Sequence, residues 1–137
     1  MGRILSIDYG TKRVGIAVSD PTKVIAGGLT TVHANEVMAF LVDYTLREPV
    51  ECFIVGHPKQ MNGQDSESMK FIVPFIKQLE KKFPDIPVKL VDERFTSKMA
   101  FQTMIDAGLK KKQRQNKALV DTISAAIILQ SYLDSQR

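Results

Sequence analysis

The chain has 137 residues, of which 44% are hydrophobic and 25% charged, which predicts one globular domain over residues 1–137 and argues against a disordered or multidomain protein. No apolar run approaches the roughly 20 residues that a membrane span requires, and the start leads into a strand too early for a signal peptide. We therefore expect a cytoplasmic protein without a membrane partner. Lys and Arg outnumber Asp and Glu by 19 to 15, and this net charge of +4 mildly favours polyanionic partners.

The first part of the chain predicts strands followed by a helix. Apolar, β-branched segments at 3–9 and 14–19 flank turn-forming residues and indicate a β-hairpin, and a third short strand is expected at 28–32. Asn35 is the predicted N-cap of a helix that ends before Pro49, because apolar residues recur between them at helical spacing.

The rest of the chain predicts alternating strands and helices. Strands are expected at 52–55 and 88–91, and helices at 68–83, 96–107 and 118–133. Pro74 falls inside the first of these helices, where it predicts a kink or a later start. Antiparallel strands followed by alternating strands and helices predict an α/β fold, in which a mixed sheet carries helices on its faces.

The first candidate site residue is Asp8, which ends the first expected strand on the face shared with Ile4 and Ser6. Gly10, two residues later, leaves room beside it for a phosphate or a substrate backbone. An Asp that only caps the turn through an Asx-type hydrogen bond is the alternative interpretation.

The second candidate is Glu93, because it follows the strand expected at 88–91. Its neighbour Asp92 must point to the opposite face, so we do not expect both side chains to bind the same ion. Alternation alone leaves open which of the two faces inward. A surface ion pair between Asp92 and Arg94 is the alternative interpretation.

The third candidate is Asp121, which lies on the apolar stripe of the last expected helix, the face that should pack on the sheet. That stripe contains Ala118, Ala125, Ile128, Leu129 and Tyr132. A buried carboxylate is tolerated when it is paired, hydrogen-bonded or bound to a metal, so this position predicts a nearby cation. Because Asp121 is expected in the first turn of its helix, an interaction with the helix dipole is the alternative.

The types of donor predict which ion such a site would hold. Carboxylates from three distant segments form an oxygen-ligand site suited to Mg²⁺ or Mn²⁺, whereas zinc is disfavoured because only His33 and His57 accompany a single cysteine. That cysteine, Cys52, lies in an apolar run, which predicts a buried and unreactive thiol. Two such ions would activate a water and stabilise the leaving oxygen in a phosphodiester displacement.

Four sequence blocks together resemble a known family. They are DYGTKRVGIAVSD at 8–20, VGHP at 55–58 with MNG at 61–63, DERFTS at 92–97, and VDTISAAIIL at 120–129. In this order they are similar to the YqgF/RuvX family, whose members are assigned as Holliday junction resolvases and as nucleases for the 5′ end of precursor 16S rRNA. His57 departs from the apolar or aromatic residue usual at its position, which affects the loop and not the expected metal site.

The resemblance implies a ribonuclease H-like fold, in which three antiparallel strands and then two parallel ones form a five-stranded mixed sheet flanked by helices. It also implies a metal-dependent nuclease with Asp8, Glu93 and Asp121 as catalytic residues and as ligands of Mg²⁺ or Mn²⁺. Asp8 is expected to bridge two ions. Lys12 and Arg13 match the family's basic pair, which is expected to touch phosphate.

A basic run before the last expected helix is the predicted backbone-binding segment. It contains Lys110, Lys111, Lys112, Arg114 and Lys117. Because it is close to Asp121 in the chain, we expect it to follow a phosphate backbone, although a solvated loop would have the same composition. Arg94 matches the family's acidic block and is expected to orient Glu93 or to meet the substrate.

Other functions stay open at this point. The first hairpin also resembles the phosphate-binding segment of actin-like and sugar-kinase ATPases, but those enclose ATP between two domains. A non-catalytic RNA-binding ribosome-assembly factor is a second alternative. The sequence does not discriminate between precursor rRNA and branched DNA as the nucleic-acid partner. A resolvase that cuts a junction symmetrically would dimerise, so the expected state is a monomer or a weak homodimer.

Overall fold

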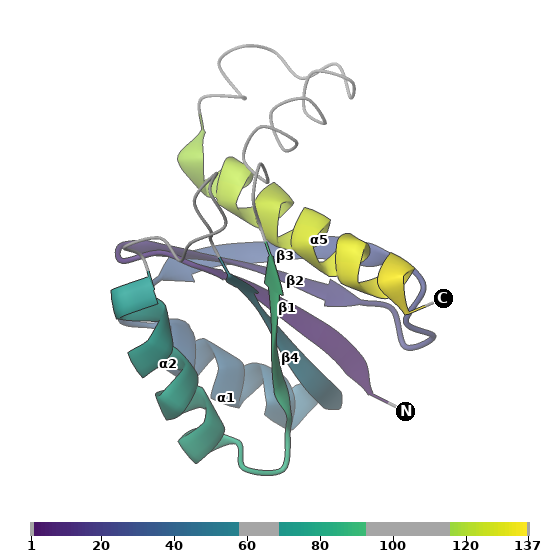
Figure 1. The fold of residues 1–137 in the computed structure, drawn as a ribbon, viewed down its shortest axis with the longest axis horizontal. Helices are drawn as coiled ribbons and strands as arrows, with labels where there is room; N and C mark the ends of the chain where they lie inside the picture. The colour runs from purple at the N-terminus through teal and green to yellow at the C-terminus, as the bar shows by residue number, and fades with distance from the viewer. Residues whose placement is uncertain (1, 58–68, 93–115, 137) are drawn as a thin grey trace.

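A five-stranded mixed sheet forms the centre of the computed structural model, which describes residues 2–57, 69–92 and 116–136. The strands lie in the order β3-β2-β1-β4-β5. The antiparallel strands are β1 (Arg3–Tyr9), β2 (Arg13–Ser19) and β3 (Ala26–His33), and the strands parallel to β1 are β4 (Val50–His57) and β5 (Val88–Asp92). Helices α1 (Val37–Arg47) and α2 (Met69–Lys82) cover one face, and α5 (Lys117–Ser135) covers the other (Figure 1). This architecture confirms the predicted α/β class and its mixed sheet.

The predicted elements within the described residues are present, with differences at their ends. β3 and β4 are longer than expected, because the β2–β3 ladder runs from Arg13↔His33 to Ser19↔Ala26 and so draws weak strand formers into the sheet. Asn35 is not the N-cap of α1. Glu36 holds that position and forms no side-chain capping bond. The helix expected at 96–107 lies outside the described residues.

Two helices begin differently from what the pattern suggested. α2 begins at Met69 with Pro74 inside it, so the later start is wrong. α5 begins at Lys117, and its N-cap Asn116 accepts a hydrogen bond from the backbone N–H of Leu119. Asp121 is therefore the fifth residue of its helix and not part of the first turn. The helix dipole acts mainly within the first turn, so this start weakens the dipole account of Asp121.

Alternation along the strands gives the sheet two separate cores. Leu5 and Ile7 of β1 face α1 and α2, whereas Ile4 and Ser6 face α5. The core beneath α1 and α2 contains Leu5, Ile7, Val14, Ile16, Val37, Leu41, Tyr44, Phe53, Val55, Ile72, Phe75 and Leu79. The core beneath α5 contains Ile4, Ala17, Cys52, Ile54, Ala125, Ile128, Leu129 and Leu133. The α5 face carries smaller side chains, which lets that helix approach the sheet closely.

Cys52 lies in the core beneath α5, where its side chain is buried and free of a disulfide. Burial raises the pKa of its thiol, which disfavours the reactive thiolate. The prediction of a buried, unreactive cysteine is therefore confirmed. Across the described residues, no helix combines the length and apolar character needed to cross a bilayer.

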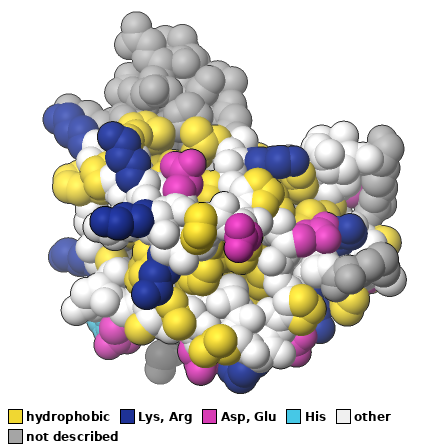
Figure 2. Space-filling view, turned by 90° about the horizontal axis from the view of Figure 1, so that it is seen from below, with side chains coloured by type: hydrophobic (Ala, Val, Ile, Leu, Met, Phe, Trp, Pro, Cys, Tyr) yellow, Lys and Arg dark blue, Asp and Glu magenta, His cyan; other side chains and the backbone are white. Residues whose placement is uncertain are grey.

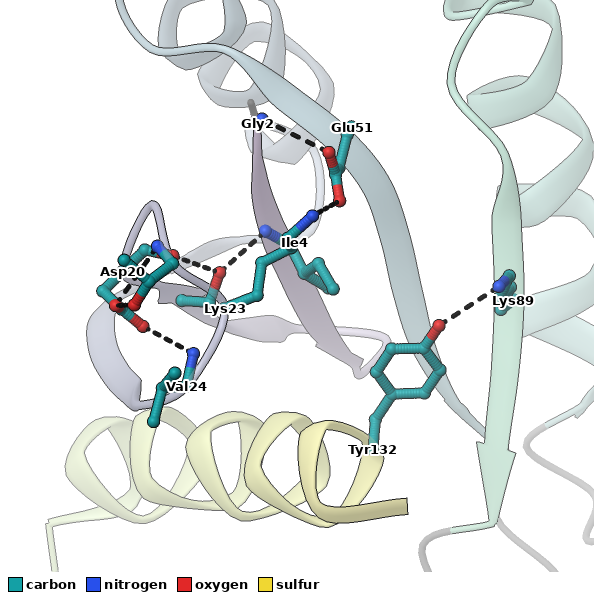
Figure 3. A network of polar contacts seen from close by, with 10 residues as sticks. Gly2, Ile4, Asp20, Lys23, Val24, Glu51, Lys89 and Tyr132 are labelled. Atoms are coloured by element: carbon teal, nitrogen blue, oxygen red, sulfur yellow. Dashed lines mark hydrogen bonds and ion pairs between the residues drawn. The ribbon is translucent and has the colours of Figure 1, made fainter. Parts of the chain in front are cut away.

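Asp20 organises the turn between β2 and β3, at the end of the sheet where β1 begins (Figure 3). Its Oδ1 accepts hydrogen bonds from the backbone N–H groups of Ile25 at 2.8 Å and Val24 at 2.9 Å. Its Oδ2 accepts from the backbone N–H and the hydroxyl of Thr22. These bonds, with that from Ile25 the strongest, hold the pKa of Asp20 well below its ordinary value of 3.8.

We expect Asp20→Asn to lower the free energy of unfolding at neutral pH and to lose that effect in acid. A carboxylate with a depressed folded-state pKa stabilises the fold above its unfolded-state pKa, and this stabilisation disappears as the pH falls through the folded-state pKa. Urea unfolding at pH ~7, ~4 and ~2.5 measures the gap between wild type and variant, which should shrink below about pH 4. Asp43→Asn, in the exposed Asp43–Arg47 pair of α1, is the control. A gap of constant size would contradict the prediction.

Candidate metal centre

Helix α5 packs directly on β2 at Gly15, and this contact sets Asp121 on the sheet. A Cβ built at Gly15 would overlap the backbone carbonyl of Asp121 and lie 3.2 Å from its Cβ. Only a residue without a side chain permits such an approach. The helix thus brings Asp121, whose side chain is 24% exposed, against the middle of the β1–β2 hairpin.

Hydroxyl groups of the sheet hold α5 in this position. The Ser6 hydroxyl of β1 donates to the backbone carbonyl of Ala125 at 2.5 Å, and the Thr31 hydroxyl of β3 donates to that of Ala118 at 2.7 Å. The buried residues of α5 are Ser124, Ala125, Ile128, Leu129 and Leu133. The prediction that this face of the helix packs on the sheet is confirmed.

Asp8 projects towards α5, on the side of the sheet where Asp121 lies. It pairs with Gly15 in the β1–β2 ladder, and directly paired residues of antiparallel strands project to the same face. Ser6, two residues earlier on β1, also reaches α5. Gly15 therefore lies between the two carboxylates that the sequence analysis singled out, and its missing side chain leaves them facing one another.

Arg13 is a charged partner of Asp121 that the sequence analysis did not foresee. Its Nε donates to Oδ2 of Asp121 at 2.8 Å, with side chains 38% and 24% exposed. A partly exposed pair of this kind contributes no more than about 1 kcal/mol. Its role is orientation: the contact engages one carboxylate oxygen and fixes the direction of the other. Arg13 was expected to touch phosphate, and here it lies beside the candidate ligand itself.

The carboxyl ends of β1, β4 and β5 lie at one edge of the sheet, because these strands are parallel. Ile7 is level with Val55, and Val55 with Leu90, so the next row consists of Asp8, Gly56 and Val91. Gly56 alternates with Ile54, which packs beneath α5. It therefore leaves the α5 side of the sheet open between Asp8 and β5.

The two faces of β5 are distinguished by contacts with α5. The Lys89 ammonium donates to the Tyr132 hydroxyl at 3.1 Å, and Val91 packs against the core beneath α5. Odd-numbered positions of β5 thus face α5, a choice that alternation alone left open. Glu93 follows β5 in the chain with the same parity as these two residues.

Several predicted site residues lie outside the described part of the chain. They are Glu93, Arg94, Lys110, Lys111, Lys112 and Arg114. Lys12 is exposed in the turn between β1 and β2. Over 2–57, 69–92 and 116–136, no group of three His, Cys, Asp or Glu side chains is placed to hold a metal ion. The two predicted ligands that the structure does describe, Asp8 and Asp121, are both carboxylates, and this donor chemistry fits a hard divalent cation.

Comparison with known proteins places the whole chain among relatives of one kind. The profile of the RuvX family, described as Holliday junction resolvase, matches residues 2–135. A protein of Phocaeicola vulgatus is 64% identical over 137 residues, which cover 100% of this chain and 99% of the relative. Proteins of Bacteroides thetaiotaomicron and Flavobacterium johnsoniae are 61% and 60% identical with the same coverage. All three relatives carry the name "Putative pre-16S rRNA nuclease".

Solved structures share the fold at low sequence identity. RuvC of T. thermophilus in complex with a Holliday junction substrate superposes with a TM-score of 0.60 and 15% identity, covering 99% of this chain and 96% of that one. A second Thermus thermophilus RuvC structure gives 0.57 and 18%, covering 98% and 95%. These similarities confirm the ribonuclease H-like fold that the sequence resemblance implied.

Proposed function

This chain belongs to the RuvX family, and from that premise we propose that it is a metal-dependent endonuclease that processes the 5′ end of precursor 16S rRNA. The observation that carries the proposal is the placement of Asp8 and Asp121 on either side of Gly15, at the sheet edge where β5 leads into Glu93. The names of the relatives support the choice of substrate.

In the proposed site, Asp8, Glu93 and Asp121 are both the catalytic residues and the ligands of Mg²⁺ or Mn²⁺. When bound, a pair of such ions supplies an activated water and neutralises charge on the leaving oxygen of an in-line displacement. Asp8 would be shared between the two ions because it lies at the centre of the edge, next to the open position at Gly56. Arg13 holds Asp121 by Oδ2 and thereby presents Oδ1 to the site.

The basic residues around the site would bind substrate phosphates. Lys12 is exposed at the tip of the hairpin, in the same turn that leads from Asp8 to Arg13. Arg94 follows Glu93 in the chain. The run Lys110, Lys111, Lys112 and Arg114 precedes α5. Cations around a carboxylate centre would offset the repulsion between the acids and a phosphodiester and position the backbone for attack.

Holliday junction resolution is the second candidate function, because the family profile carries that description. The two candidates differ in a measurable way. A resolvase makes paired cuts in a four-way DNA junction and would use two copies of the chain, whereas a single processing cut in RNA requires one. Size-exclusion chromatography with light scattering, with and without a junction, separates a monomer from a dimer.

The test incubates the purified protein with labelled precursor 16S rRNA, a four-way DNA junction and linear DNA, each with Mg²⁺, Mn²⁺ or chelator. We expect cleavage near the 5′ end of the rRNA precursor with either metal and none in chelator, because the acids alone cannot activate water. Cleavage of the junction alone would favour the second candidate. Tight RNA binding without any cleavage would identify a non-catalytic assembly factor, and cleavage that persists in chelator would refute the metal mechanism.

A further inference from the structure

Three lysines form a single line along the outer surface of α2. Lys70, Lys77 and Lys81 are separated by seven and four residues, which places them within about 40° of one another around the helix axis. All three are exposed. The buried residues of α2, which are Ile72, Phe75 and Leu79, occupy the opposite side of the helix. We call these three lysines the lysine ridge.

The charge of the ridge is not balanced by neighbouring acids. α2 contains four lysines, the fourth being Lys82, against the single acid Glu80. Elsewhere in the described residues the basic side chains of Arg3, Arg13, Lys23 and Arg47 each pair with a carboxylate. Within that same part of the chain, no lysine of α2 forms a salt bridge. Figure 2 shows Lys and Arg side chains gathered on the side of the molecule where α2 lies in Figure 1.

Helix stability accounts for only part of this pattern. Lys81 lies in the last turn of α2, where a cation interacts favourably with the helix dipole. Lys70 lies in the first turn, where the dipole disfavours a cation, and that turn contains no acid. A lysine that opposes its own helix and has no partner in the described residues indicates a ligand from outside the fold.

The ridge begins at the end of the sheet that carries the candidate metal centre. Tyr9, which follows Asp8, stacks on Phe75 of α2 with ring centroids 4.4 Å apart. Figure 1 shows α2 starting at this end and running away from it. From Lys70 to Lys81 the helix rises about 16 Å. Because a duplex gains one pair of phosphates per roughly 3.4 Å, the ridge spans about five base pairs.

We propose that the lysine ridge binds the phosphate backbone of the substrate outside the cleavage site, as a flanking contact for the duplex arm that passes over the sheet edge onto α2. The inference rests on the proposed nuclease function and extends it to the extent of nucleic acid bound. Phosphates are the partner that fits, because unpaired ammonium groups at regular intervals match a regular polyanion. The ridge contributes to affinity and not to the chemical step.

The test compares the triple variant Lys70→Gln, Lys77→Gln and Lys81→Gln with wild type in binding assays in chelator, where cleavage is not needed for the readout. The probes are a long-armed four-way DNA junction, precursor 16S rRNA, and a duplex too short to reach from the metal centre to the ridge. Losing three phosphate contacts should lower the slope of log affinity against log salt by about 2.7 units for the duplex-armed probe. The advantage of wild type should fall roughly 40-fold between 50 and 200 mM salt.

The control variant removes the same charge elsewhere, through Lys23→Gln, Arg47→Gln and Lys89→Gln, and should retain the wild-type slope on every probe. The short duplex should bind the ridge variant and wild type equally. An unchanged slope in the ridge variant would overturn the proposal, as would an equal loss in the control. Binding of polyglutamate to the ridge without any effect on nucleic acid would overturn it in favour of an acidic protein partner. Failure of wild type to cleave any substrate refutes the nuclease function and leaves these binding results to be judged separately.

Discussion

Asp8→Asn and Asp121→Asn should each reduce metal-dependent cleavage by roughly a thousandfold while leaving the protein folded. A metal ligand supports several kcal/mol of transition-state stabilisation, and each 1.36 kcal/mol corresponds to a factor of ten in rate. Asn keeps the shape of the side chain but removes the negative charge that a hard divalent cation requires. Both acids are only partly buried, so neutralising them leaves no enclosed charge without a partner.

The measurement is single-turnover cleavage of the preferred substrate with saturating metal, together with urea unfolding to confirm the fold. Asp43→Asn is the matched control, because Asp43 is an exposed carboxylate paired with Arg47 within α1, and it should cleave like wild type. Arg13→Gln separates orientation from ligation. It should reduce the rate less than Asp121→Asn, since the carboxylate remains and only its anchor is lost. Near-normal cleavage by both Asp variants would refute the proposed metal centre.

Gly15→Ala should destabilise the fold by about 1–3 kcal/mol and cost cleavage about a hundredfold beyond what that destabilisation explains. The added methyl group would overlap the backbone of Asp121, so α5 must move away from β2 as a unit. Overpacking of this kind typically costs that much stability. A displacement of about 1 Å at a catalytic group reduces rates on the order of a hundredfold.

Gly27→Ala is the control for the intrinsic effect of replacing a strand glycine. A Cβ there would meet only the backbone oxygen of Val18, at an ordinary 3.8 Å. Gly28→Ala gives an intermediate case, because its Cβ would approach the terminal Cγ2 of Thr122 at 2.7 Å, and a side-chain end can rotate away. Unfolding and cleavage are measured for all three variants. If Gly15→Ala matched Gly27→Ala in both, the close contact would not position Asp121.

The local periodicities of the sequence were sufficient for the elements and for the direction in which two of the three acids point. Alternation along β1 placed Asp8 on the face of Ile4 and Ser6, and the Ser6–Ala125 hydrogen bond confirms that this face meets α5. The helical stripe around Asp121 predicted the packing of α5 on the sheet, which the burial of Ala125 and Leu129 confirms. These properties depend on backbone geometry repeated every two or 3.6 residues, so they can be read within a short segment.

The partners of these residues were decided only by the tertiary structure. Arg13 and Asp121 are 108 residues apart, and nothing in either segment indicates that they pair. The same holds for Gly15, whose role is visible only once the axis of α5 is placed over β2, and for β5, whose α5-facing side is set by Lys89 and Val91. Sequence patterns state which faces are apolar, whereas strand register and helix placement select which side chains meet. Register and placement come from the free energy of packing the whole chain, and no short segment contains that information.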